Sequence, residues 1–303
     1  LRAAVAKLHG HGLREENVCI GNGSDDILNL LVRAFCDANS DAGYTLLLSA
    51  PEHQRSQAEA PAILRALLQR GVDAVALLGT EYPSAVFSML ATHRLPFVML
   101  WAEHSPHGVC VGFDEQAAAA LVVDHLADGG HQRIGFIGGR TANNERARRR
   151  FHGVLQAVAR RGLMLPPAHM LETDYGFAEG FAAMQTVLQQ AAPRPTAMIC
   201  GNDYLAAGAL AALDQAGVAV PAELSVASFN DNDFAAYLHP PLTTVRVPIR
   251  RMGEVAGQYL LRQLRADAVQ ARASTETPAL SSDAAPALSS DAAPALLPIE
   301  LVV

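Results

Sequence analysis

Short, continuously apolar runs alternate along this chain with longer segments in which apolar residues recur at helical spacing. Apolar runs of about four to eight residues without polar alternation are typical of strands that are buried on both faces. The runs around Leu46, Leu77 and Val98 are each followed by such a helical pattern. The alternation predicts an α/β fold in which helices cover both faces of a parallel sheet.

The pattern places the expected elements along most of the chain. Strands are predicted at residues 18–20, 44–49, 72–79, 97–101, 109–113, 133–139, 198–200 and 224–229. Helices are predicted at residues 1–8, 27–35, 54–69, 83–92, 115–126, 144–161, 205–216 and 252–264. Because the series starts afresh near residue 133, the pattern favours two lobes of similar design.

These lobes are expected to be discontinuous in sequence. We assign residues 1–130 and 242–266 to an N-terminal lobe, and residues 131–241 and 295–303 to a C-terminal lobe. Residues 267–294 read as a low-complexity, flexible insertion, because Pro-Ala-Leu-Ser-Ser-Asp-Ala-Ala occurs twice in tandem from Pro278. The last residues, 297–303, are predicted to return as an edge strand.

Composition narrows the functional classes. The formal net charge of -7 over 303 residues argues against strong electrostatic binding of nucleic acid. No apolar run approaches the roughly 20 residues of a membrane span, so no membrane partner is expected. The four cysteines are widely spaced, and neither they nor the histidines have metal-site spacing. We therefore expect neither a metal nor another cofactor. Because the sequence starts at Leu1 and not at a methionine, it says little about N-terminal signals.

The turn Gly201-Asn202-Asp203 has a clear position in this pattern. It joins a short apolar strand to a helix rich in alanine, so its polar side chains lie at the carboxyl end of a strand. Open α/β sheets bind ligands at such points. Asn202 and Asp203 serve either as ligand contacts or as caps of the helix.

Several ordered segments resemble one family of bacterial transcription regulators, the lactose/galactose/purine-repressor family. The resemblance extends from about Ala42 to Leu264, and the final residues, 298–303, also look like this family's last strand. The segments that carry the resemblance are residues 43–48, 70–73, 125–131, 133–139, 201–209, 220–226 and 240–245.

The resemblance implies a fold and a function. The fold would be a type I periplasmic-binding-protein-like arrangement of two Rossmann-like lobes joined by three crossovers, with a small effector in the cleft between the lobes. The effector would be a sugar or a nucleobase-type molecule. The resemblance also implies a cytoplasmic homodimer that binds operator DNA only through a helix-turn-helix head, and no such head is visible in this chain.

Individual cleft residues follow from the same resemblance. Arg150 and Asn202 match an effector-contacting arginine and a cleft amide, which suit bidentate and hydroxyl recognition respectively. The family's usual Gly-Phe-Asp-Asp reads Ser-Phe-Asn-Asp here, so Asn230 replaces a carboxylate, and Asp231 is either a ligand contact or a cap. Two aromatic residues are candidates for stacking or for the core: Tyr82 and Trp101.

Residues 1–38 depart from that family. They resemble a fragment of histidinol-phosphate aminotransferase, in which a Gly-Ser-Asp turn begins a helix that holds the phosphate of pyridoxal phosphate. The combination suggests a fusion or a deliberate chimera, with one strand–turn–helix unit replacing another. Three polar residues of this turn are candidates to line the cleft or to stabilise the turn: Asn22, Ser24 and Asp25.

Other functional classes are weaker alternatives. An aminotransferase needs a Schiff-base lysine, and the single lysine, Lys7, precedes the phosphate turn. A transport-type sugar-binding protein of the same fold would need an export signal, which the chain does not show. A serine hydrolase would need a Gly-x-Ser-x-Gly elbow, which is absent from the sequence. We therefore expect a binding protein and not an enzyme.

Overall fold

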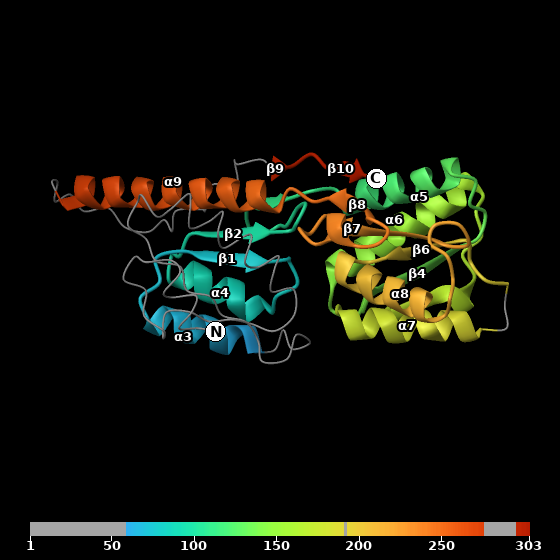
Figure 1. The fold of residues 1–303 in the computed structure, drawn as a ribbon. Coiled ribbons are helices and arrows are strands. Elements are labelled where there is room, and N and C mark those ends of the chain that lie inside the picture. Colours follow the sequence, from blue (N-terminus) through green and yellow to red (C-terminus); the bar gives the residue numbers. More distant parts are fainter. Residues whose placement is uncertain (1–58, 191–192, 276–294) are drawn as a thin grey trace. The chain divides into compact units, whose positions relative to one another are not determined.

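The computed structural model describes residues 59–190, 193–275 and 295–303, and they form two compact units. The chain passes between the units three times, after Gly112, after Pro248 and after Leu297. The number of crossings agrees with the expectation from the resemblance. Each unit contains a mostly parallel sheet flanked by helices (Figure 1).

Within the described part of the chain, the first unit has a sheet whose paired strands are all parallel. Its strand order is β1-β2-β3-β9. Helix α9 packs on strands β2 and β3, and the opposite face is covered by α3 and α4 (Figure 1). The elements are α3 Ala60–Gln69, β1 Val75–Leu78, α4 Ser84–Thr92, β2 Phe97–Leu100, β3 Cys110–Gly112, α9 Ile249–Thr275 and β9 Ala295–Leu296.

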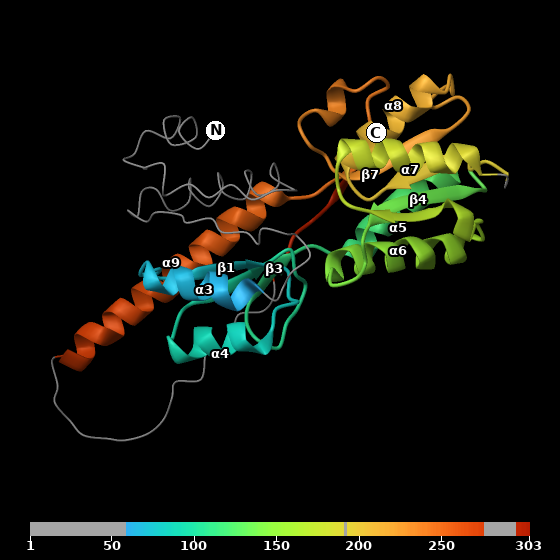
Figure 2. The ribbon, with the colours of Figure 1, turned by 90° about the horizontal axis from the view of Figure 1, so that it is seen from below.

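The second unit has a larger sheet with strand order β10-β8-β7-β6-β4-β5. All neighbouring strands are parallel except β10, which runs antiparallel to β8 at the edge. Helices α5 and α6 cover one face, and α7 and α8 cover the other (Figure 2). The elements are α5 Glu115–Asp128, β4 Ile134–Gly139, α6 Glu145–Arg161, η4 Pro167–His169, β5 Met170–Thr173, α7 Phe177–Gln189, β6 Ala197–Cys200, α8 Asp203–Gln215, β7 Ser225–Asn230, η5 Ala235–Tyr237, β8 Thr243–Arg246 and β10 Glu300–Val302.

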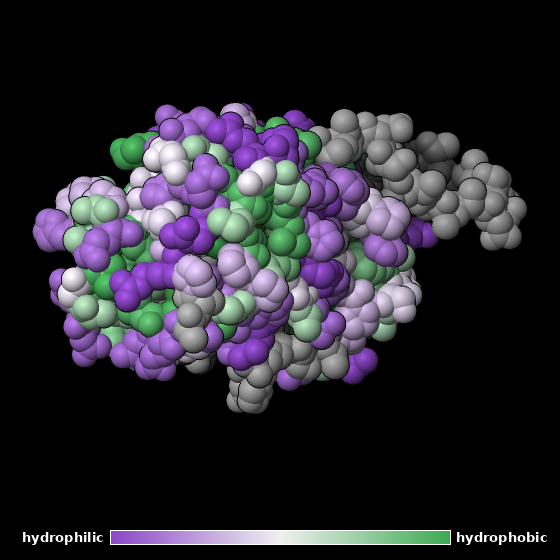
Figure 3. Space-filling model, turned by 90° about the vertical axis from the view of Figure 1, so that its right-hand side faces the viewer, coloured by the Kyte–Doolittle hydropathy of each residue, from purple (hydrophilic) through white to green (hydrophobic). Residues whose placement is uncertain are grey.

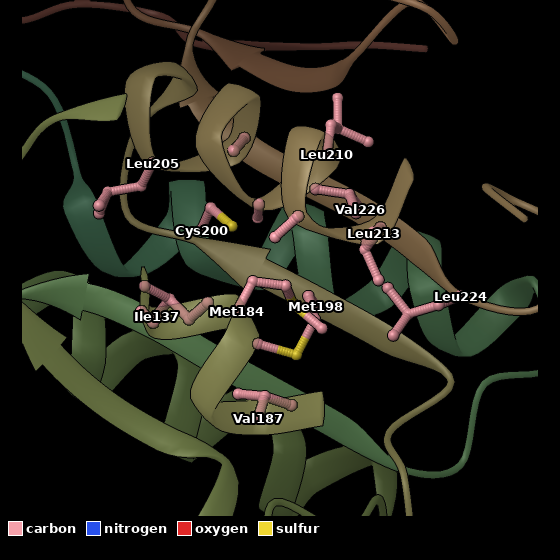
Figure 4. Packing of buried hydrophobic residues seen from close by; sticks show 14 of the residues in the cluster. Ile137, Met184, Val187, Met198, Cys200, Leu205, Leu210, Leu213, Leu224 and Val226 are labelled. Atoms are coloured by element: carbon pink, nitrogen blue, oxygen red, sulfur yellow. The ribbon is translucent and has the colours of Figure 1, made fainter. Parts of the chain in front are cut away.

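The core of the second unit lies between its sheet and helices α7 and α8. Met184 of α7 and Met198 of β6 are fully buried and lie against each other (Figure 4). The two helices also approach closely, because a Cβ atom at Gly208 would overlap the backbone oxygen of Phe177. This close packing fixes the N-terminal ends of α7 and α8, which both start at the carboxyl edge of the sheet.

The predicted α/β fold is confirmed, and so is the edge strand at the C-terminus, β10. The flexible insertion was predicted to begin at residue 267, but α9 continues to Thr275. Strong helix formers such as alanine, arginine and glutamine dominate residues 265–273 and extend the helix. The rest of that insertion, and the predicted elements before residue 59, lie outside the described residues.

The division into units differs from the predicted lobes. Helix α5 belongs to the second unit because it packs along α6, and β8 belongs there because it pairs with β7. Strand β9 belongs to the first unit because it extends the sheet beside β3. The pattern also did not predict β5, α7 or β8.

The surface in Figure 3 is mainly hydrophilic, with hydrophobic residues gathered in a few patches. Among the residues that the structure describes, no helix is both long and apolar enough to cross a lipid bilayer.

Candidate functional site

The carboxyl ends of β4, β6 and β7 form one edge of the second sheet, and glycines open space there. A Cβ atom at Gly139 would overlap the ring of Tyr175, and one at Gly201 would lie 3.3 Å from Tyr175 Cε1. The missing side chains therefore let Tyr175, a partly buried residue, lie against the strand ends. Burial raises the pKa of Tyr175 above its usual value, while the nearby Arg150 lowers it.

Sequence reasoning missed Tyr175, although it directly precedes Gly176, the N-cap of α7. The signal in the sequence that could have identified Tyr175 was an aromatic residue beside the start of a helix and the end of a strand.

Arg150 lies beneath this edge on α6, and only 6% of its surface is exposed. Its Nε and Nη2 atoms donate to the two carboxylate oxygens of Glu115, at 2.8 and 3.0 Å. Its Nη1 atom donates to the carbonyl oxygen of Gly201. The guanidinium carbon also lies 4.5 Å from the centre of the Phe229 ring. Arg150 is therefore not on a solvated helix face, and three of its N–H groups bind protein acceptors.

Asn202 is buried at the end of β6, with 4% of its surface exposed. Its Oδ1 atom accepts a hydrogen bond from the backbone N–H of Leu205 at 2.9 Å, which makes it the N-cap of α8. Of the two predicted roles of Asn202, ligand contact and helix cap, its side-chain oxygen has the role of a helix cap. Arg150 lies close by, since it binds the carbonyl of the preceding residue, Gly201.

Asn230 and Asp231 continue the edge at the end of β7. Both adopt positive φ angles, 113° and 57°. Asn230 is 4% exposed, and its Oδ1 atom has no hydrogen-bond partner within the described ranges. Asp231 accepts a hydrogen bond from Arg246 Nε at 2.6 Å, so its negative charge is paired with an arginine on the neighbouring strand β8. An unsatisfied buried acceptor such as Asn230 Oδ1 is costly unless a water or ligand binds it.

Asp203 is a further buried polar residue at this edge, and the sequence predicted it, like Asn202, to be either a ligand contact or a cap of the helix. Its side chain is fully buried, and its carboxylate accepts bonds from Ser228, Thr244 and the backbone of Asn232. Burial raises its pKa to about 6, although the three hydrogen bonds oppose that shift. The burial of Asp203 depends on contacts with distant residues, which no local pattern shows.

The remaining candidates lie elsewhere. In the first unit, the Tyr82 hydroxyl binds both the N–H and the carbonyl of Leu78, at 3.1 and 3.0 Å. Trp101 follows β2 with a φ of 57° and is 5% exposed, so its ring is a core residue. Three candidates lie outside the described residues: Asn22, Ser24 and Asp25. The second unit thus brings together four of the predicted residues: Arg150, Asn202, Asn230 and Asp231.

Comparison with known proteins defines the class first. A family described as the periplasmic binding protein-like domain matches residues 123–281. The crystal structure of transcription regulator GntR from Chromobacterium violaceum is similar over 91% of this chain and 93% of that chain. Its TM-score is 0.77 and its sequence identity is 28%. The chain is therefore a periplasmic-binding-protein-like domain of the kind found in transcription regulators.

Curated relatives then define the family. The chain is 32% identical over 241 residues to the HTH-type transcriptional repressor PurR of Erwinia tasmaniensis, covering 78% of this chain and 70% of that protein. It is 30% identical over 247 residues to the HTH-type transcriptional repressor CytR of Escherichia coli K12, covering 81% and 71%. The chain spans about two thirds of the length of its curated relatives. It belongs to the lactose/galactose/purine-repressor family.

Proposed function

We propose that the carboxyl edge of the second sheet binds a small, polar effector, a sugar or a nucleobase-type molecule. The observation that carries this proposal is the buried, unsatisfied Oδ1 atom of Asn230 at the end of β7, directly after Phe229, whose ring lies 4.5 Å from the guanidinium carbon of Arg150. A hydroxyl or amide N–H of a ligand would satisfy this acceptor. Tyr175 supplies an aromatic face against which a sugar or base ring can pack.

The ion pairs at this edge support a neutral effector, and the Asp203 carboxylate is fully buried. Glu115 is paired with Arg150, and Asp231 is paired with Arg246. The family's usual carboxylate is the amide of Asn230 in this chain. Since both charged pairs are internally balanced, recognition would depend mainly on hydrogen bonds and ring packing.

A ligand screen tests this proposal directly. We would measure thermal shifts of the chain with neutral sugars, nucleobases and nucleosides, and then titrate each hit by calorimetry. Asn230→Gly removes the amide and tolerates the positive φ angle, so it should weaken binding about tenfold or more for a lost buried hydrogen bond. Tyr175→Ala should weaken the same ligand. Gln156→Ala, at an exposed position on α6, is the control. If both site variants bind the ligand as tightly as the wild-type protein does, the proposed site is wrong.

Binding without turnover is the second part of the proposal. Two groups that resemble nucleophiles are unsuited to that role. Burial and the nearby Asp203 raise the pKa of the Cys200 thiol to about 12, and the Ser228 hydroxyl donates to Asp203. A hit ligand incubated with the protein should therefore be recovered unchanged, as mass spectrometry would show.

We further propose that the regulator acts as a cytoplasmic homodimer. Support for an interface comes from an aromatic surface formed by Phe177, Tyr204 and Phe234, whose ring centres lie 4.8 to 5.7 Å apart. Phe177 is 51% exposed, and the nearby η5 residue Tyr237 is 81% exposed. Exposed aromatic groups of this kind favour protein interfaces. Sedimentation velocity should show a dimer for the wild-type protein and weaker dimerisation for Phe177→Ser and Tyr237→Ser. If the wild-type protein and both variants are monomers, the proposed homodimer is refuted.

Operator DNA would be bound through a helix-turn-helix head domain and not through the two units that the structure describes. The formal net charge of -7 supports this assignment of DNA binding to the head domain. The isolated chain should show no sequence-specific DNA binding in a fluorescence anisotropy titration, whereas specific binding would overturn the proposal.

A further inference from the structure

The buried carboxylate of Asp203 has neutral donors around it. It is the first residue of α8, its side chain is fully buried, and three segments donate to it. Ser228 Oγ from β7 and Thr244 Oγ1 from β8 donate to Oδ1, the latter at 2.8 Å. The backbone N–H of Asn232 donates to Oδ2 at 2.7 Å. One side chain thus joins α8, two strands and the loop that follows β7.

That loop needs support, because its first residues have unfavourable backbone angles. Asn230 has a φ of 113°, and Asp231 has a φ of 57°. Such conformations are strained for non-glycine residues and persist only where surrounding contacts hold them. Two contacts follow directly in the chain: the Asp231 N–H donates to Thr244 Oγ1 at 3.3 Å, and the Asn232 N–H donates to Asp203.

We propose that Asp203 is a positioning residue whose ionised carboxylate holds the Asn230–Asn232 loop and so presents Asn230 at the carboxyl edge of the second sheet. The consequence for ligands rests on the proposed function. The loop conformation itself does not, because the contacts belong to the protein alone.

The proposal implies that the loop responds to protonation. Burial raises the pKa of Asp203 to about 6, and the titratable groups near it are Asp231 in the loop and the Cys200 thiol on β6. Oδ1 already accepts two hydroxyl donors, so an added proton would occupy Oδ2. There it would compete with the N–H of Asn232 and weaken the hydrogen bond that holds the loop.

Nuclear magnetic resonance of the full chain between pH 5 and pH 8 tests this inference. The amide proton of Asn232 should shift with a midpoint near the Asp203 pKa of about 6. Ser228→Ala removes a donor that stabilises the carboxylate, so the midpoint should move to higher pH. Asp203→Asn should abolish the titration. Asp214→Asn, an exposed carboxylate on the same helix, is the matched control and should leave the midpoint unchanged.

Each outcome has a definite meaning. An Asn232 amide that does not titrate, or a midpoint that Ser228→Ala leaves unmoved, would overturn the positioning role. If Asp203→Asn fails to fold, the Ser228→Ala measurement still decides. If the loop titrates as expected but no sugar or base binds, the proposed function fails while the role of Asp203 stands.

Discussion

Glu115 and Arg150 form a buried ion pair between α5 and α6, with the guanidinium group donating to both carboxylate oxygens. The two side chains are 3% and 7% exposed, so the charges are removed from water. A third bond from Arg150 reaches the carbonyl of Gly201 at the end of β6. The pair therefore connects two helices on one face of the sheet to the strand end where the candidate site lies.

Breaking this pair should destabilise the second unit strongly. Arg150→Met leaves the Glu115 carboxylate buried without the guanidinium group that balances its charge, and such a change typically costs about 3–5 kcal/mol. Urea unfolding would measure the loss of free energy of unfolding. The double variant Arg150→Met/Glu115→Leu should recover much of it, because no buried charge remains. Equal stability of the single variant and wild type would show that the pair does not form.

More of the fold than of the candidate site could be predicted from the sequence. Continuous runs without polar residues, such as residues 134–139, predicted the parallel strands, because strands buried on both faces need no polar alternation. Strand β5 was missed since it lies at the edge of the sheet and is only partly buried, with Glu172 exposed.

Site geometry depended on contacts between distant residues. Arg150 and Glu115 are 35 positions apart, and Asp203 and Thr244 are 41 apart. Local spacing indicated that Asn202 lies at a strand end beside a helix, which the structure confirms. It could not show that Arg150 would have a buried carboxylate partner. It also could not show that Asp203 would be fully buried.

The N-cap of α8 allows stability to be separated from ligand recognition at Asn202. Asn202→Ala removes the acceptor of the Leu205 N–H and should cost about 1 kcal/mol. Asn202→Asp retains a capping oxygen and should keep most of the stability. If the amide also donates to a ligand, both variants should lose affinity in calorimetry although only the alanine variant is destabilised. Wild-type affinity in Asn202→Asp would limit the residue to capping.

Gly208 permits the close contact of α7 and α8. A Cβ atom there would overlap the backbone oxygen of Phe177, and a backbone atom cannot move away as a flexible side chain can. Gly208→Ala should therefore destabilise the unit by about 1–3 kcal/mol, despite the better helix propensity of alanine. Ala211→Ser, at an exposed position on the same helix, is the control for urea unfolding. Stabilisation by Gly208→Ala would mean that the helices are further apart.

His131 links the starts of two strands and should make stability depend on pH. Its Nδ1 and Nε2 atoms each lie 3.0 Å from a hydroxyl, that of Thr196 and that of Ser225. Because the Thr196 hydroxyl donates to the carbonyl of Arg133, Nδ1 carries the proton and Nε2 accepts from Ser225. Burial, followed by repulsion from His125, lowers the pKa of His131 below 6.5.

The sign of the effect follows from this lowered pKa. The unfolded chain binds a proton at His131 more tightly than the folded chain does. The stabilising contribution is thus complete above pH 6.5 and is lost as the pH falls through the folded-state pKa. Asp203, with its raised pKa of about 6, acts in the opposite direction, since its contribution is lost as the pH rises through that value. Comparing wild type with His131→Gln cancels the Asp203 contribution. The stability advantage of wild type in urea unfolding should shrink between pH 7.5 and pH 5, and an advantage that stays constant or grows would contradict the assigned hydrogen bonds.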